Sequence, residues 1–320
     1  MLILRRKGWE IAERHVTPEN VFLNRRHFMA AAAGAVALAG SASARAEDDP
    51  SAGLYPAKAN PDFADAGRPV TEESYNTTFN NYYEFGSSKR IARAADALPI
   101  RPWTIAIDGE VEKPMTLAID DLLKQVSLEE RIYRHRCVEA WAMVVPWTGF
   151  PLARLVEIAR PTANAKYVRF ETFNNPEIAS GQQPGLFGAY PWPYVEGLTL
   201  AEATNDLAFL VTGAYGKPVA RSMGAPLRLH LPWKYGFKSI KAIVKVSFTA
   251  ERPVSFWEQL GPSEYGFWAN VNPEVAHPRW SQANEQMLGT GEMVPTQLFN
   301  GYGAFVADLY RGLEAEKLYM

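Results

Sequence analysis

The sequence predicts an α+β protein whose core is mainly β-sheet, with short helices and long loops. Six segments are typical of strands, because β-branched and aromatic residues dominate them or alternate along them. Three helical patterns are only five to eight residues long, and 23 prolines and 23 glycines are spread along the chain as loop residues. The strands and helices do not alternate regularly, so a repeating βα architecture is not expected.

The first two strand candidates show the alternation most clearly. Residues 103–111 are rich in β-formers, and Trp103, Ile105 and Ile107 alternate along them before the Asp108-Gly109 turn signal. Along residues 131–138, Cys137 falls on one face of the strand, and Arg134 and Arg136 fall on the other. The remaining strand candidates are 167–172, 207–212, 227–231 and 240–248.

The helical patterns begin at recognisable positions. Residues 117–124 follow Thr116, and residues 152–159 follow Pro151. Residues 200–204 give the third pattern. The loops between such short elements are where we expect any functional site to lie.

Residues 1–46 are typical of a twin-arginine signal peptide. Arg25 and Arg26 precede an Ala-rich apolar stretch of about 13 residues, whereas a bilayer span needs about 20. The small residues that follow offer a cleavage site. Twin-arginine signals direct folded proteins across the membrane, so we expect a periplasmic protein. An uncleaved N-terminal anchor is the alternative.

The rest of the chain is expected to form an arm and one domain. Residues 47–75 are rich in Ala, Pro, Asp and Gly, which predicts an extended arm on the domain or a loose linker. Residues 76–320 are expected to be a single catalytic domain. Without residues 1–46, 26 basic and 32 acidic side chains remain, so the net charge changes from −2 to −6. This balance argues against nucleic acid or a polybasic membrane face, and no later segment is typical of a membrane span.

Cys137 is the only cysteine, so the chain cannot form an internal disulfide. It lies in the run Arg134-His135-Arg136-Cys137, which is too charged to be ordinary core packing. We expect the two arginines to lower the pKa of the thiol. A thiolate of this kind suits a soft metal or a reactive role. An inert buried cysteine is the alternative.

Two loops carry further polar and aromatic groups. Residues 79–85 combine amides and phenols that could bind a heterocyclic cofactor, or could simply anchor a surface loop. Residues 229–241 bring three lysines to a glycine-bearing turn, which predicts an anion site. A solvated basic hairpin is the alternative.

Several mechanisms lack their sequence signals. The chain has no Gly-x-Gly-x-x-Gly or Walker motif and no nucleophile-elbow serine. The three histidines beyond the leader are too scattered for a standard zinc or haem pattern, and one cysteine cannot hold an iron–sulfur cluster.

Several long motifs, in the same order, resemble the MsrP family of periplasmic protein-methionine-sulfoxide reductases, which belongs to the sulfite-oxidase-like molybdenum proteins. The motifs are Arg-x-Arg-Cys-Val-Glu-Ala-Trp around Cys137, Asn-Asn-Tyr-Tyr-Glu-Phe at 80–85, Pro-Trp-Lys-Tyr-Gly-Phe-Lys-Ser-Ile-Lys at 232–241, and the blocks 264–273, 277–282, 299–302 and 309–313. The resemblance runs from the twin-arginine leader to the C-terminal region. It implies a β-rich sulfite-oxidase-like molybdopterin-binding fold.

The resemblance also implies the site. Cys137 would ligate molybdenum beside the dithiolene of one molybdopterin per chain. The pterin contacts would come from Asn80, Tyr83, Glu84, Thr172 and Arg228, and the phosphate contacts from Ser239, Ile240 and Lys241. Met223 stands where the family usually has an Asn, and a thioether cannot replace the donor and acceptor of an amide. Ser222 is a possible substitute.

The implied reaction is reduction of methionine sulfoxide, free or in oxidised envelope proteins, to methionine. Trp141, Trp233 and Tyr235 are the candidates for an apolar pocket wall. Because the chain carries no haem or flavin signal, electrons would come from the family's membrane haem b partner, MsrQ, fed by quinones. We expect a monomer that pairs with this subunit. A sulfite dehydrogenase on the same fold and a non-enzymatic envelope-binding module are the alternatives.

Overall fold

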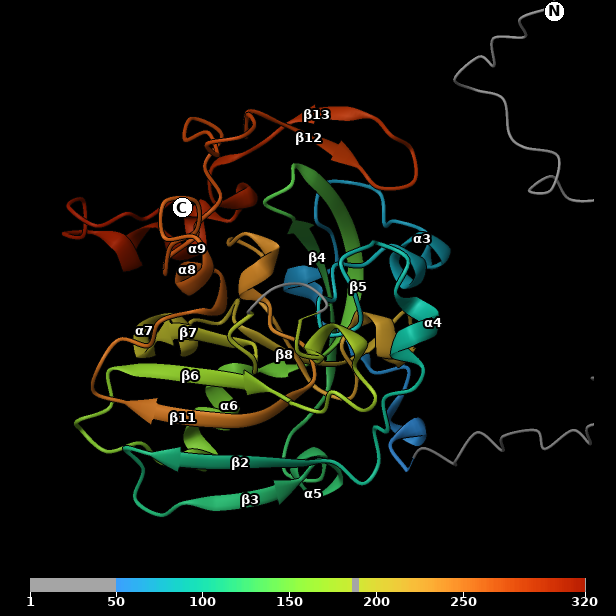
Figure 1. The fold of residues 1–320 in the computed structure, drawn as a ribbon, viewed down its shortest axis with the longest axis vertical. Coiled ribbons are helices and arrows are strands. Elements are labelled where there is room, and N and C mark those ends of the chain that lie inside the picture. The colour runs from blue at the N-terminus through green and yellow to red at the C-terminus, as the bar shows by residue number, and fades with distance from the viewer. Residues whose placement is uncertain (1–49, 186–189, 320) are drawn as a thin grey trace, which may run out of the picture. The chain divides into compact units, whose positions relative to one another are not determined.

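Two β-sheets organise the computed structural model, which describes residues 50–185 and 190–319 (Figure 1). Within these residues the larger sheet has eight strands and the smaller has five. The larger sheet contains β1 (Lys58–Ala59), β4 (Glu129–Arg136), β5 (Trp141–Pro151), β8 (Phe209–Ala214), β9 (Lys217–Pro218), β10 (Arg228–His230), β12 (Asn284–Met287) and β13 (Met293–Pro295). The smaller contains β2 (Thr104–Gly109), β3 (Met115–Ala118), β6 (Tyr167–Thr172), β7 (Val195–Thr199) and β11 (Ile243–Thr249).

The helices are short and connect or cover the sheets. The α-helices are α3 (Glu73–Thr78), α4 (Ala92–Ala95), α5 (Ile119–Leu123), α6 (Leu152–Ala159), α7 (Leu200–Ala203), α8 (Phe256–Leu260) and α9 (Gly303–Val306). The 3-10 turns are η2 (Ala52–Leu54), η3 (Pro61–Phe63), η4 (Ser180–Gln182), η5 (Arg221–Met223), η6 (Gly236–Lys238), η7 (Leu298–Gly301) and η8 (Ala307–Tyr310). The predicted β-rich α+β class is therefore confirmed. No described helix has the length and apolarity needed to cross a membrane.

Strand pairing is mixed in both sheets. In the larger sheet β5 lies between β4 and β8, both antiparallel to it, and β12 pairs with the start of β5 in parallel. In the smaller sheet β11 pairs in parallel with β2 and antiparallel with β6. Figure 1 shows the β12–β13 hairpin next to the start of β5, where the chain leaves the β4–β5 turn. That turn contains Cys137.

Local sequence patterns predicted several elements closely. β6 and α6 have the predicted bounds, and β4, β8, β10 and β11 overlap their predicted segments. Residues 115–118 are an exception, because they form strand β3 and helix α5 begins only at Ile119. The N-cap of α5 is Ala118, so Thr116 does not cap this helix.

The longest strand, β5, was not predicted from the sequence. Pro146 and Gly149 are typical strand breakers, yet both lie inside it. The pairing of β5 with β8 is irregular between Thr148 and Gly149. A Cβ at Gly149 would lie 2.0 Å from the carbonyl oxygen of Leu210 on β8. Glycine is therefore required by the close approach of the two backbones.

Aromatic side chains from both sheets form one buried cluster. Trp147, Phe150 and Phe209 come from the larger sheet, and Phe170 and Phe248 come from the smaller one. Each is at most 1% exposed. Burial of such a side chain contributes about 1.5–3 kcal/mol, so this cluster fixes the sheets that carry the site.

The segment before α3 lies against the larger sheet. β1 pairs in parallel with β4, and Tyr55 donates a hydrogen bond from its hydroxyl to the Thr212 carbonyl oxygen at 3.0 Å. Thr71 exchanges hydrogen bonds with the backbone of Val144 on β5. Pro50–Met320 packs as one unit. The predicted signal peptide, residues 1–46, lies outside the described residues.

Candidate functional site

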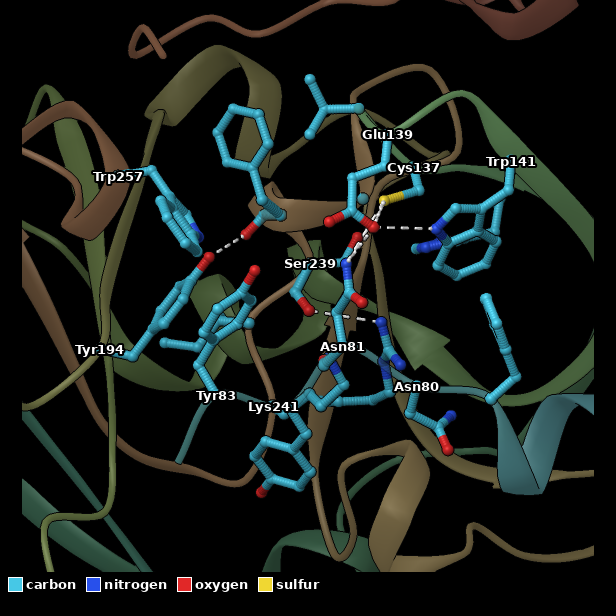
Figure 2. Close-up of a pocket in the computed structure, with 18 of the residues that line it drawn as sticks. Asn80, Asn81, Tyr83, Cys137, Glu139, Trp141, Tyr194, Ser239, Lys241 and Trp257 are labelled. Atoms are coloured by element: carbon cyan, nitrogen blue, oxygen red, sulfur yellow. Dashed lines mark hydrogen bonds between the residues drawn. The ribbon is translucent and has the colours of Figure 1, made fainter. Parts of the chain in front are cut away.

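The main pocket opens beside the end of β4, where loops from distant parts of the chain meet, and the empty space within it, open solvent included, is about 840 Å³. Its walls come from residues 79–84, the turn 137–141, Arg228 on β10, and residues 236–241. Figure 2 shows Cys137 next to Glu139, with Trp141 to one side and Trp257 to the other.

The sulfur of Cys137 is presented by a tight turn between β4 and β5. The Cys137 amide donates to the Trp141 carbonyl at 2.9 Å, and the Ala140 amide donates to the Cys137 carbonyl at 3.0 Å. Ala140 adopts a left-handed conformation with φ 62°. Asn81 places its amide nitrogen 3.6 Å from the sulfur. The Cys137 side chain is buried but lines the pocket.

Burial, followed by the nearby Glu139 carboxylate, raises the pKa of the Cys137 thiol to about 12. The expectation that the neighbouring arginines lower this pKa overall is therefore wrong. Arg136 does lower it, but its guanidinium is fully buried and bonded to Glu285 at 2.7 Å. Arg134 lies on the opposite face of β4 and donates to the Ala66 carbonyl at 2.6 Å. Without a bound cation the thiol is thus neutral at physiological pH, whereas a metal would displace its proton.

The Glu139 carboxylate lines the pocket and contacts three hydrogen-bond donors. Its Oε2 accepts from Asn81 Nδ2 at 3.1 Å and from Trp141 Nε1 at 3.3 Å, and it forms an ion pair with Lys89. Burial raises the pKa of Glu139, but Lys89 and Asn81 outweigh burial and the net shift is downward. The same oxygen lies 3.9 Å from the Cys137 sulfur. A carboxylate and three donors therefore surround the position next to the thiol.

Eight of the nine predicted cofactor residues line this pocket: Asn80, Tyr83, Glu84, Cys137, Arg228, Ser239, Ile240 and Lys241. Thr172, the ninth, does not line it. Its buried hydroxyl donates to the Ala242 carbonyl at 3.2 Å, so it holds the backbone between Lys241 and the start of β11. The structure thus brings distant segments together, while the binding roles of these residues stay predictions.

The polar groups in the pocket fit an anionic, heteroatom-rich cofactor. Within the described residues, Asn80 Oδ1 and Tyr82 Oη are buried without a hydrogen-bond partner. Lys241 donates to the Asn81 carbonyl at 2.8 Å, and Arg228 donates to the Met223 carbonyl at 2.7 Å. Neither cation forms an ion pair with a carboxylate in the described part of the chain, although the Glu84 carboxyl acts on Lys241 electrostatically. Burial lowers the pKa of both. Buried charges are costly unless paired, so a bound phosphate or dithiolene would complete the site.

Only one of the three predicted lysines faces the pocket. Lys234 and Lys238 are fully buried and form ion pairs of 2.5 Å with Glu202 and Glu196. The three-lysine anion site was therefore wrong in two of its members, and the solvated basic hairpin was wrong as well. No local pattern could predict these ion pairs, because each joins residues that are far apart in the chain.

The walls are aromatic but differ from the predicted set. Trp141 lines the pocket as predicted. Trp233 is instead completely buried and donates to the Tyr310 hydroxyl at 2.7 Å, while Tyr235 lines a small separate cavity. Trp257 and Tyr265 take their place, with ring centroids 5.1 Å apart. Tyr83 packs edge-on against Trp257 at 4.9 Å.

Met223 contributes to the site only through its backbone. Its side chain belongs to the buried apolar core, while its carbonyl holds Arg228. Ser222 donates its hydroxyl to the Thr77 carbonyl at 2.8 Å. The Ser222 hydroxyl proton is therefore already used, which leaves only its acceptor capacity.

Comparison with known proteins identifies the class. Residues 93–257, just over half of the chain, match the family described as "Oxidoreductase molybdopterin binding domain". The chain belongs to this family, so it is an oxidoreductase with a sulfite-oxidase-like molybdopterin-binding fold, and a molybdenum cofactor is implied. This confirms the predicted fold and the cofactor's class.

One solved structure gives a weaker likeness. The sulfane dehydrogenase SoxCD from Paracoccus pantotrophus matches with a TM-score of 0.41 and 18% sequence identity, over 49% of this chain. The match covers 41% of the SoxCD chain.

Proposed function

We propose that this protein is a periplasmic molybdoenzyme that reduces methionine sulfoxide, free or in oxidised proteins, to methionine. The observation that carries the proposal is the pairing of a lone buried thiol with aromatic walls in one pocket. Trp141, Trp257 and Tyr265 offer the polarizable surface that a thioether side chain favours. The motif resemblance supplies the choice of sulfoxide among possible substrates.

The molybdenum cofactor, when bound, would supply two-electron oxygen-atom transfer from the sulfoxide. Cys137 would hold the metal. Arg228 and Lys241 would neutralise the cofactor's negative charge. The side-chain oxygen of Asn80, which has no hydrogen-bond partner, would accept a hydrogen bond from an N–H group of the cofactor ring.

The residues beside Cys137 would orient the substrate. Asn81 lines the pocket and donates to Glu139 beside the Cys137 sulfur, where its amide can direct a sulfoxide oxygen inward, while Lys89, which does not line the pocket, pairs with Glu139. The overall change consumes two electrons and two protons and yields a thioether and water. The aromatic walls would exclude bulk water from the sulfur.

Localisation and partners are part of the same proposal. The twin-arginine motif supports export of a folded, loaded enzyme, and residues 47–75 would form the arm between the leader and the catalytic domain. Two electrons per turnover would come from a membrane haem b subunit of the MsrQ type. One molybdopterin per chain and a monomer paired with that subunit complete the proposal.

The decisive experiment compares substrates on purified protein of known molybdenum content. With a reduced dye as donor, we expect methionine sulfoxide to be consumed and one molybdenum per chain. Oxidation of sulfite with an electron acceptor, without sulfoxide reduction, would instead establish the sulfite dehydrogenase. Protein purified from the periplasm without stoichiometric molybdenum would contradict both.

A further inference from the structure

The turn that carries Cys137 is held by side chains from the C-terminal region, outside the matched residues 93–257. The Val138 carbonyl oxygen accepts two hydrogen bonds, from Trp280 Nε1 at 2.7 Å and from Gln282 Nε2 at 2.8 Å. The Ala140 carbonyl accepts from the Gln286 amide of β12 at 2.9 Å. Both carbonyls of the turn therefore depend on residues more than 140 positions away.

Gln282 connects the turn to the buried ion pair behind it. Its side chain is 1% exposed and uses both ends of the amide. Nε2 donates to Val138, while Oε1 accepts from Arg136 Nη2 at 2.8 Å. Arg136 also donates from Nη1 to the Cys137 carbonyl. The amide thus closes a ring of hydrogen bonds through Arg136, Cys137 and Val138.

Trp280 is itself held in a fixed orientation. Its ring stacks on His277 with centroids 3.8 Å apart and planes 8° apart. The indole N–H is therefore aimed before any ligand binds. A carbonyl oxygen with two directional donors has both of its lone pairs engaged, so the peptide plane after Val138 has little freedom to rotate. The direction of the Cys137 side chain follows from the backbone of this turn.

We propose that Gln282 and Trp280 are positioning residues that orient the Cys137 sulfur toward the metal. This inference rests on the proposed role of Cys137 as the molybdenum ligand. Neither side chain lines the main pocket, so Trp280 acts through the Val138 carbonyl, and Gln282 acts through the Val138 carbonyl and through Arg136. Groups that orient a metal ligand commonly change metal affinity or activity by about 10- to 100-fold when they are removed.

The lone cysteine gives a direct measurement of this orientation. Because Cys137 is the only thiol, the rate of alkylation by iodoacetamide reports on it alone. The variants are Gln282→Met, which keeps the volume but removes both hydrogen bonds, and Trp280→Phe, which keeps the stack but removes the donor. Trp268→Phe is the matched control. It removes an indole hydrogen bond, donated to Glu316 at 3.3 Å, that does not involve the turn.

In metal-free protein produced without molybdate, each single variant is expected to raise the alkylation rate about threefold. The double variant should raise it by more than about tenfold, since it leaves Val138 without either donor. The control should react like the wild type at an equal melting temperature. Wild-type alkylation rates in the double variant, at an unchanged melting temperature, would overturn the positioning role.

The holoenzyme separates this inference from the proposed function. If Cys137 ligates molybdenum, the double variant should also lose bound metal and shift the Mo(V) electron paramagnetic resonance spectrum. Faster alkylation of metal-free protein together with wild-type metal content and spectrum would support the positioning of the turn, but would count against the proposed metal role of Cys137.

Discussion

Replacing Glu285 by glutamine is expected to lower the free energy of unfolding by about 3–5 kcal/mol. Both Glu285 and Arg136 have side chains that are 0% exposed, and their Oε2 and Nε atoms lie 2.7 Å apart. Glu285 also pairs with Arg68 and accepts from Thr296 at 3.1 Å. The substitution keeps the shape of the side chain but leaves a buried guanidinium without its counter-charge, which accounts for the size of the effect.

Urea unfolding of metal-free protein, followed by tryptophan fluorescence and extrapolated to water, measures this loss without a contribution from cofactor binding. Glu157→Gln is the matched control, because Glu157 pairs with Arg154 at 2.8 Å with both side chains more than 60% exposed. Such a surface pair contributes about 0–1 kcal/mol. If the two variants lose the same free energy, the buried ion pair is not what holds this region.

Four further outcomes are expected. Cys137→Ser should retain the wild-type melting temperature but lose molybdenum and sulfoxide reduction, and normal turnover would exclude the thiolate role. Because burial raises the folded-state pKa of Cys137 to about 12, above about 8.5 in the unfolded chain, the stability of metal-free protein should fall as pH rises through this interval, and Cys137→Ser should remove that part of the fall. Lys241→Met should reduce the amount of bound cofactor, measured by metal analysis, without lowering the melting temperature of the apoprotein. Lys245 is partly exposed, and Lys245→Met should change neither quantity. Equal metal content in the two variants would refute the anion-binding role of Lys241. Gly149→Ala should destabilise by more than about 2 kcal/mol through collision with β8, whereas Gly53→Ala, with open space around it, should not, and equal melting temperatures would contradict the packing argument.

Elements whose signal lies within a few neighbouring residues could be predicted from the sequence. The strand at 167–172 was located because Val168 and Phe170 alternate with polar residues, and both are fully buried. β5 was missed because Gly149 is required by its pairing with Val211 on β8, about 60 residues further along, while Pro146 is accommodated opposite Ile132 on β4. Tertiary contacts therefore overrode local propensity at this strand.

The site was predictable where motifs are continuous and unpredictable where it is assembled from distant pairs. The loop at 80–84 and the run at 239–241 do reach the same pocket as Cys137. The roles of Lys234 and Lys238 depend on partners that no local pattern reveals. Likewise, the effect of Arg136 on the thiol depends on Glu285, which draws the guanidinium behind the turn.

The dependence of the Cys137 turn on Trp280, Gln282 and Gln286 has a consequence for biosynthesis. A nascent chain cannot complete this turn until Gln286 has been translated, because the supports follow Cys137 by more than 140 residues. Insertion of a cofactor that needs the finished turn would then wait for synthesis of this distant segment. Products truncated before residue 280 would remain empty.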